Sequence, residues 1–420
     1  MAGAAERRNY QADECPVTIR RTVVPGGQDI GPEVPSWRAG LLLIALPPLL
    51  AFAAAHAVDY AAAVHSGFAT GFFGPGRWIH HDSHQYLAIA LRHYTLRHCH
   101  KRTIPPHSYC GNAGWLPLYP KLVNLLGRLG MPLPWAGKYL AEACALGTLV
   151  LVWMLIGPSW SAPSLLALAL AAVFPGQVYY FTVSPVSLAA LLSVAFLLLL
   201  ARSRYVLAGL AGAAVPWAYP TGFLLPGVAV VYTAIADRGR SFGDWLERLV
   251  PSAGIAALGT MALLLAYQVW THRWSAYFLV QTKYGNGIHN PAAIFLASLT
   301  GGTHARYAIQ GANEGYEYLP AKAQTVLVAA LVLTLVAASL TWWRTSLTRA
   351  EWAVLCYVVL IWLFPLTQSI AVSRYRSEAL LIPAVALARR LPLVVQISLV
   401  AAAAWIAFGM AVLFFQARLI

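Results

Sequence analysis

The run L-L-L-I-A-L-P-P-L-L-A-F-A-A-A at residues 41–55 contains no charged side chain. It lies within an apolar segment from about Trp37 to Val64, and about 20 such residues cross a bilayer as a helix. Similar runs recur along the 420-residue chain, in which 59% of residues are hydrophobic and 10% charged. A soluble domain carries about 25% charged residues. Because lipid leaves backbone polar groups without water and no alternating strand pattern occurs, we expect an all-α, polytopic integral membrane protein.

Basic residues favour the cytoplasmic side of a membrane and so predict topology. The polar residues 1–35 contain four arginines and are expected to form a disordered cytoplasmic tail before a membrane domain at 36–420. Ten to twelve spans then follow, although the segment 115–130 is short for a span. The loops 65–114 and 271–322 are expected to face outside and to contain short amphipathic helices. The basic turns expected on the inner side lie near residues 202–204, 238–248, 344–349 and 389–390.

The formal net charge of +14 points to membrane lipids, with their anionic head groups or lipid phosphates, as partners. No basic stretch interleaved with aromatics lies on a soluble domain, which argues against nucleic acid. The chain has no Walker A and no G-x-G-x-x-G motif. We also expect no buried acid–base pairs in the hydrophobic core, and this lowers the case for a proton-coupled transporter.

Residues 78–94 read W-I-H-H-D-S-H-Q-Y-L-A-I-A-L-R-H-Y, and Asp82 is the single carboxylate of the first outer loop. The apolar spacing predicts an interfacial amphipathic helix. Asp82 then either caps the helix, with Ser83 as an alternative cap, or presents a carboxylate at the level of the head groups. His80 and His84 have metal-ligand spacing around Asp82, but no H-E-x-x-H or C-x-x-C motif frames them, which favours an ordinary polar surface over a dedicated transition-metal site.

Two further chemical expectations come from the same loop. A divalent cation (Mg or Mn) could bridge Asp82 and a phosphate, a site separate from any histidine cluster. Cys99 and Cys110 flank a short segment, and a disulfide between them is plausible if the loop faces an oxidising compartment.

Four stretches occur in an order that resembles one known family. They are D-S-H-Q-Y-L-A-I-A-L-R-H-Y followed by W-L-P-L-Y-P, then V-F-P-G-Q-V-Y-Y-F-T-V-S-P-V-S-L, A-Y-P-T-G-F-L-L, and V-S-R-Y-R-S-E-A-L-L-I-P. Together they resemble the PIG-V-type mannosyltransferases (the GPI mannosyltransferase II type), which are GT-C glycosyltransferases. The resemblance covers residues 78–383. The sequence departs from the family pattern at His81, Val186 and Tyr219.

The resemblance implies a GT-C-like helical bundle that moves a sugar, expected to be mannose, from a polyprenyl or dolichyl phosphate to a glycolipid or glycan acceptor. The reaction would occur with inversion at the outer face, in a bacterial plasma membrane or, in a eukaryote, the ER membrane. Asp82 would be the general base, a role that suits the lone acid of the loop.

The leaving phosphate needs cationic donors, and arginine can bind it through two nitrogens. Arg374 and Arg376 are the first candidates, and further ones are Arg92, Lys101 and Arg102. The motifs also place these residues in the substrate pocket: Ser83, Tyr86, Pro117, Tyr119, Tyr219, Thr221 and Tyr375. The loop 271–322, rich in aromatics and Asn, is the expected acceptor side.

Two other classes of function remain open. A transporter or flippase of lipid-linked intermediates would use the same outer cations to attract a head group. A non-catalytic membrane scaffold would need neither Asp82 nor Arg374.

Overall fold

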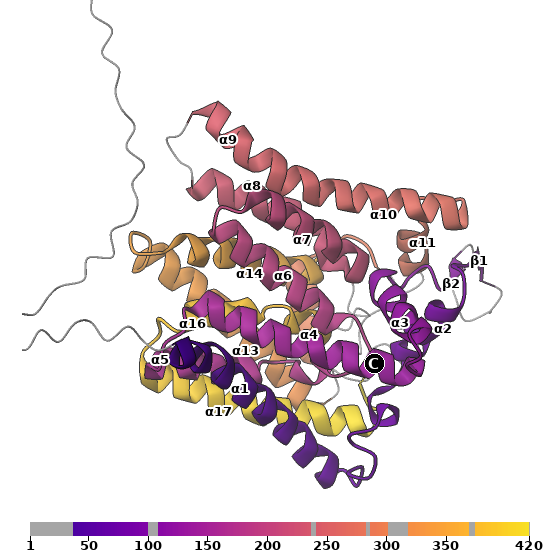
Figure 1. The fold of residues 1–420 in the computed structure, drawn as a ribbon, viewed down its shortest axis with the longest axis horizontal. Helices are drawn as coiled ribbons and strands as arrows, with labels where there is room; N and C mark the ends of the chain where they lie inside the picture. The colour runs from indigo at the N-terminus through magenta and orange to yellow at the C-terminus, as the bar shows by residue number, and fades with distance from the viewer. Residues whose placement is uncertain are drawn as a thin grey trace, which may run out of the picture. The chain divides into compact units, whose positions relative to one another are not determined.

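The computed structural model describes residues 37–99, 108–236, 241–282, 286–300, 318–368 and 374–419. The chain divides into Met1–Leu42 and a compact unit, Leu43–Ile420. The predicted tail at 1–35 lies outside the described residues. The second unit is a bundle of helices that run roughly side by side (Figure 1).

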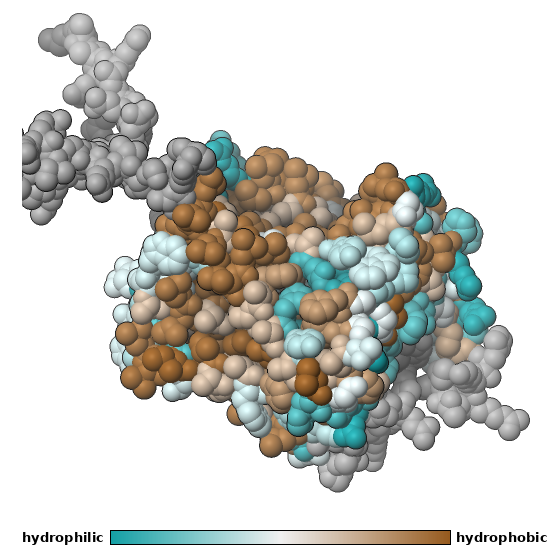
Figure 2. Space-filling view, turned by 60° about the horizontal axis from the view of Figure 1, so that its bottom comes forward, coloured by the Kyte–Doolittle hydropathy of each residue, from teal (hydrophilic) through white to brown (hydrophobic). Residues whose placement is uncertain are grey.

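Six helices in the described ranges are long and apolar enough to cross a membrane. They are α1 (Trp37–His65), α4 (Leu133–Ile156), the continuous helix formed by α9 (Phe242–Leu249), η4 (Val250–Gly254) and α10 (Ile255–Thr271), α13 (Leu319–Thr341), α14 (Arg349–Leu366) and α17 (Leu393–Phe415). Shorter apolar helices are α5 (Ala162–Ala172), α6 (Val186–Ala201), α7 (Tyr205–Ala218), η3 (Pro220–Leu224) with α8 (Leu225–Ala236), and α12 (Pro291–Thr300). The chain is therefore an all-α, multi-pass membrane protein. Figure 2 shows its broad apolar face, with polar residues gathered toward one end.

Three of the predicted basic turns meet at one end of the bundle, here called the basic end. Arg349 donates to Ser203 over 3.4 Å, and Arg390 donates to Ser346 over 3.0 Å. Arg389 donates to the carbonyl of Ile156. These contacts bring the starts of α7, α14 and α17 together with the end of α4. The helices α2 (Asp82–Leu91), α3 (Leu118–Arg128) and α11 (Ala276–Thr282) lie at the opposite end, here called the site end (Figure 1).

Three apolar segments do not form one long helix. The segment 115–130 contains only α3, whose 11 residues rise about 16 Å, and α3 packs on α2 and α4. The segment 163–181 contains α5 and then the 3-10 helix η2 (Gln177–Tyr180). The segment 377–388 is a series of short pieces: α15 (Arg374–Ala379), η6 (Ile382–Ala384) and α16 (Val385–Ala388). Pro175 follows α5 and Pro383 lies in η6, and proline favours such breaks because it lacks an N–H and its ring clashes with the preceding turn.

The expectation that the hydrophobic core contains no acid–base pair is wrong. Lys138 forms an ion pair with Glu142 one turn later on α4, and Glu142 also lies 3.4 Å from Nε2 of His56 on α1. Asp59 of α1 is fully buried, and its Oδ1 accepts a 3.0 Å hydrogen bond from Gln177. These groups come from three separate apolar segments, so their partners cannot be identified from local spacing.

Helices α7 and α10 approach so closely that only glycine fits at the contact. A Cβ on Gly259 would lie 2.4 Å from the Cα of Ala213, and a Cβ on Gly209 would lie 2.1 Å from the carbonyl oxygen of Pro251. Small residues allow such close backbone packing in lipid, where no hydrophobic force drives helices together. This contact fixes α10 against α7, whose last residue precedes Tyr219.

We predict that Gly259→Ala destabilises the protein by about 1–3 kcal/mol, because the added methyl group overlaps the backbone of α7. The measurement is thermal unfolding of the detergent-solubilised protein. Gly227→Ala on α8 is the matched control, since a Cβ there meets no atom within 4 Å. An unfolding temperature unchanged in both variants would contradict the described packing.

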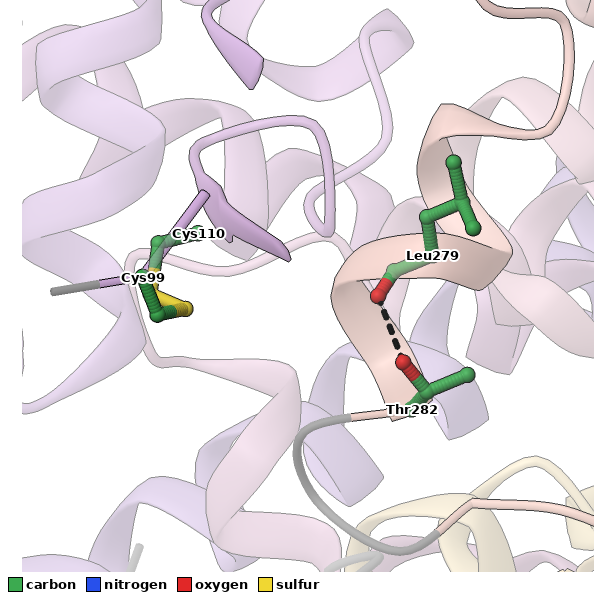
Figure 3. The surroundings of a disulfide bond; sticks show 4 residues. All are labelled: Cys99, Cys110, Leu279 and Thr282. Carbon is green, nitrogen blue, oxygen red and sulfur yellow. Dashed lines mark hydrogen bonds between the residues drawn. A yellow bond between two sulfur atoms is a disulfide. The ribbon is translucent and has the colours of Figure 1, made fainter. Parts of the chain in front are cut away.

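A short hairpin at the site end is closed by the disulfide between Cys99 and Cys110. Its strands are β1 (Leu96–His98) and β2 (Tyr109–Gly111), which pair antiparallel with Arg97 opposite Cys110. Figure 3 shows the disulfide near the end of α11, where Thr282 donates to the carbonyl of Leu279. The disulfide that the spacing of these two cysteines made plausible is thus formed in this structure.

We expect Cys99 and Cys110 to resist alkylation in denaturant until a reductant is added, because only free thiolates react. Peptide mass spectrometry of the unreduced and reduced protein measures this. Cys144 and Cys356 are free and buried in the folded chain, so in denaturant they should be alkylated with or without reductant. Labelling of Cys99 before reduction would show that the hairpin is open.

Candidate functional site

Asp82 is the first residue of α2, and its side chain does not cap the helix. The residue in the N-cap position is His81, which makes no capping hydrogen bond through its side chain. Ser83 does not cap α2 either; its hydroxyl accepts a 3.3 Å hydrogen bond from the backbone N–H of His80. The cap interpretation of Asp82 is therefore wrong, and the carboxylate is available for contacts outside its own helix.

The backbone at His81 is strained. Its φ of 41° and ψ of −104° lie outside the regions that residues with a Cβ normally occupy, and such a conformation costs about 1–3 kcal/mol. Strain of this kind persists only where the surrounding structure holds it, here the buried Trp78 on one side and α2 on the other. The indole of Trp78 donates to the carbonyl of Phe72 over 2.7 Å. The sharp turn at His81 directs Asp82 toward α15.

Asp82 forms an ion pair with Arg376 of α15, 294 residues away in the sequence. The side chain of Trp115 also hydrogen-bonds the carboxylate. Burial raises the pKa of Asp82, but the charge and hydrogen bonds of Arg376 and the hydrogen bond of Trp115 lower it by more, so the net pKa is below its ordinary value. The carboxylate is ionised at neutral pH while its side chain keeps 32% exposure.

Arg376 is held in place by the close approach of η2 to α15. Gly176, with φ of 82°, precedes η2, and a Cβ there would lie 2.7 Å from the carbonyl oxygen of Tyr375. Only glycine allows both the backbone angle and the approach. As a result the ring of Tyr179 lies 5.4 Å from the guanidinium carbon of Arg376 and stacks against Tyr375.

Two phenols border the ion pair. Tyr86, one turn after Asp82 on α2, and Tyr219, at the end of α7, both interact electrostatically with Asp82 and Arg376. Burial raises the pKa of Tyr86 well above its ordinary value and that of Tyr219 to about 12. Both are therefore neutral hydrogen-bond donors at neutral pH. Tyr277 of α11 extends this group, since it interacts with Tyr86 and Tyr219.

A small pocket opens beside the ion pair. Its volume is about 20 Å³, and its lining includes Asp82, Arg376, Thr182, Phe414 and Leu419. A space of this size holds about one water molecule. Leu419, which is 1% exposed, follows α17 and closes one wall. A sugar ring therefore fits only if the pocket widens.

The structure brings some of the predicted site residues together and separates others. Asp82 and Arg376 form the ion pair. Four other predicted residues lie around it: Ser83, Tyr86, Tyr219 and Tyr375. Pro117 and Tyr119 are buried at the start of α3, where the ring of Tyr119 packs on Tyr86 and its hydroxyl donates to Gly137. Thr221 is buried in η3. Arg92 is exposed at the end of α2. Lys101 and Arg102 lie outside the described residues.

Arg374 faces a different set of partners from Arg376. It forms a 3.3 Å ion pair with Glu378 on the next turn of α15 and donates to Thr325 of α13 over 3.2 Å. Gln324 completes the set by donating to Glu378 over 2.9 Å. Arg374 is therefore engaged within the protein, and the four side chains anchor α15 to α13.

Several residues of the site were not predicted. Trp115 stands two residues before the quoted Pro117, and Tyr179 lies inside the quoted V-Y-Y-F. Tyr277 belongs to the W-S-A-Y-F segment of the expected acceptor loop. Nothing in the sequence indicates that Trp115 contacts Asp82, that Tyr179 lies by Arg376 or that Tyr277 lies near Tyr86 and Tyr219.

The side chains around Asp82 do not fit a resident divalent cation. Its carboxylate is engaged by the guanidinium of Arg376, whose positive charge opposes a metal ion at that oxygen. Nε2 of His80 hydrogen-bonds the carbonyl of Arg77 at 3.0 Å. Among the described residues there is no group of three His, Cys, Asp or Glu that could hold a metal. The predicted cation stays a prediction, and no chemical step proposed for this site depends on it.

Comparisons with known proteins give one informative result. No protein-family model matches the sequence, and no curated protein matches it. Among solved structures, the apo crystal structure of the Archaeoglobus fulgidus oligosaccharyltransferase is similar, with a TM-score of 0.53 and 14% identity. The match covers 88% of this chain and 56% of that one, so this chain spans about half the length of that protein. At this level of identity the likeness concerns the fold, which is the all-α, GT-C-like fold of a multi-pass membrane protein.

Proposed function

We propose that the protein is an inverting glycosyltransferase that uses a polyprenyl-phosphate or dolichyl-phosphate sugar. The observation that carries the proposal is the ion pair of Asp82 and Arg376 at a pocket on the site end. It combines an ionised carboxylate, which can accept a proton, with a guanidinium, which can hold a phosphate. The GT-C-like fold adds support, since the similar solved structure is an oligosaccharyltransferase.

The reaction divides naturally between the two charges. An acceptor hydroxyl gives its proton to Asp82 as its oxygen bonds to the anomeric carbon of the donor. The bond from that carbon to the phosphate oxygen breaks with its electron pair, and Arg376 stabilises the phosphate that leaves. Base and leaving group stand on opposite faces of the sugar in such a displacement, so the ion pair must open when the donor binds. Neutral Tyr86 and Tyr219 can donate hydrogen bonds to sugar or phosphate oxygens.

The finer assignments rest on the motifs. Mannose as the sugar comes from the PIG-V-type resemblance. Arg376 is our preferred phosphate ligand, because Arg374 is engaged by Glu378 and Thr325. Tyr277 of α11 lies near Tyr86 and Tyr219, which supports α11 as part of the surface that binds the acceptor. The disulfide between Cys99 and Cys110 favours an outer location for the site end, opposite the basic end.

We predict that Asp82→Asn lowers the rate of transfer by about 10²–10⁴-fold, the usual contribution of a general base. Transfer from polyprenyl-phosphate mannose to glycolipid acceptors is measured by mass spectrometry of the lipids. Asp244→Asn, on the exposed surface of α9, is the control and should keep full activity. Transfer by Asp82→Asn at the wild-type rate would refute the base assignment. Folded wild-type protein with no transfer at all would favour a scaffold.

The pH dependence gives a second test. Because the pKa of Asp82 lies below its ordinary value of about 3.9, we expect no loss of wild-type kcat/KM from protonation of Asp82 between about pH 5 and 8. Arg376→Gln removes the charge that lowers this pKa and leaves the burial that raises it. The acid limb of the profile should therefore move to higher pH.

Arg97→Gln in the exposed hairpin is the control for this profile and should leave its midpoint unchanged. The same acid limb in Arg376→Gln and wild type would mean that Arg376 does not set the ionisation of Asp82.

A transporter of lipid-linked intermediates is the second candidate, and one observation favours it. Ionisable side chains within membrane-spanning helices often mark transport pathways, and Asp59, Lys138, Glu142 and His56 are such residues. Movement of labelled lipid across liposome membranes, with no change in lipid mass, would support transport. A change in lipid mass without such movement supports transfer.

A further inference from the structure

A second cavity lies at the basic end, away from Asp82. It has a volume of about 490 Å³ and is lined by Ile235 of α8, Leu340 of α13, Trp352 of α14 and Arg344. Ligand sites in proteins commonly have volumes of about 300–1,000 Å³ and are mostly apolar, with a few polar groups that fix orientation. Three lining side chains are apolar or aromatic and one is a cation, so the cavity has this composition.

Arg344 differs from the neighbouring arginines in its contacts. Arg389 and Arg390 are occupied by the carbonyl of Ile156 and by Glu351, which Arg390 contacts over 2.7 Å. Within the described ranges, Arg344 makes no ion pair or hydrogen bond, and its side chain is exposed. Among the residues that the structure describes, no acid lines the cavity. A guanidinium in this setting favours an anionic ligand.

The elements around the cavity indicate which class of anion it would bind. Arg344 lies three residues after the end of α13 and two residues after the exposed Trp342, and tryptophan is typical of the membrane–water boundary. Leu340, one turn earlier on α13, is 57% exposed and lies on the apolar side of that boundary. Arg349 lies on α14, one turn before Trp352. The cation Arg344 therefore shares one cavity with apolar side chains from three helices, close to the expected level of the head groups.

We propose that this cavity binds an anionic phospholipid, with its phosphate at Arg344 and the upper part of an acyl chain along Ile235, Leu340 and Trp352. Basic pockets between membrane helices on the cytoplasmic side recognise such head groups in this way. The site is separate from the Asp82 pocket and does not depend on the proposed glycosyl transfer. It also gives a local role to part of the large positive charge of the chain.

The test uses the purified full chain in a neutral detergent. Phosphatidylglycerol and phosphatidylcholine with the same acyl chains are added in turn, and bound lipid is measured by native mass spectrometry and thermal stability. We expect phosphatidylglycerol to remain bound and to raise the unfolding temperature, and phosphatidylcholine to do neither. Arg344→Gln should weaken the binding of phosphatidylglycerol about tenfold or more, the loss expected for one charge-assisted hydrogen bond.

Arg202→Gln is the matched control. It removes one exposed arginine at the same end without touching the cavity, and should leave binding unchanged. An equal loss in both variants would mean a diffuse charge effect and overturn the site. If phosphatidylglycerol and phosphatidylcholine stayed bound to the same extent, the cavity would not select an anionic head group, and the proposal would be overturned. If glycerol 1-phosphate at the same concentration raised the unfolding temperature as much as phosphatidylglycerol does, the acyl chain would contribute nothing. The cavity would then bind phosphate alone, which would also overturn the proposal.

Discussion

The ion pair between Asp82 and Arg376 joins the beginning and the end of the membrane domain, and the geometry of the site depends on it. Neither charge could stay buried alone without a large cost in solvation. The pair therefore fixes α2 against α15, and the surrounding elements are arranged to allow this. Gly176 lets η2 approach α15, and the anchoring of Arg374 to Glu378 and Thr325 holds α15 on α13. The two arginines of S-R-Y-R-S thus have different tasks on one short helix.

Irregular backbone concentrates where this site lies. In a bilayer, chain that is neither helix nor closed barrel is tolerated only when protein or water surrounds it. The breaks after α5 and after α7, and the short helix α15, are enclosed by other helices, as the buried residues of η2, η3 and α15 indicate. These three segments supply Tyr179, Tyr219 and Arg376. The polar side chains of the site therefore come from places where helices end or are short.

The sequence predicts the helical membrane fold and the amphipathic α2 well, because both depend on local composition and periodicity. It also points to Asp82, since a lone acid in an outer loop is visible without a structure. It fails for Trp115 and Tyr277, whose directions depend on packing between distant elements. It fails as well for Lys138 and Glu142, whose pair lies within an apolar helix next to His56 of another. Short broken helices such as α15 and α16 look like a span in the sequence, because hydropathy does not register where a helix bends or stops.

Leu419 has a practical meaning for work on this protein. Its side chain forms a wall of the Asp82 pocket just after α17 ends. Because this side chain is 1% exposed and lines the pocket, a change in its volume would change the space beside the carboxylate. Leu419 should therefore be left unaltered when the chemistry of Asp82 is the quantity under study.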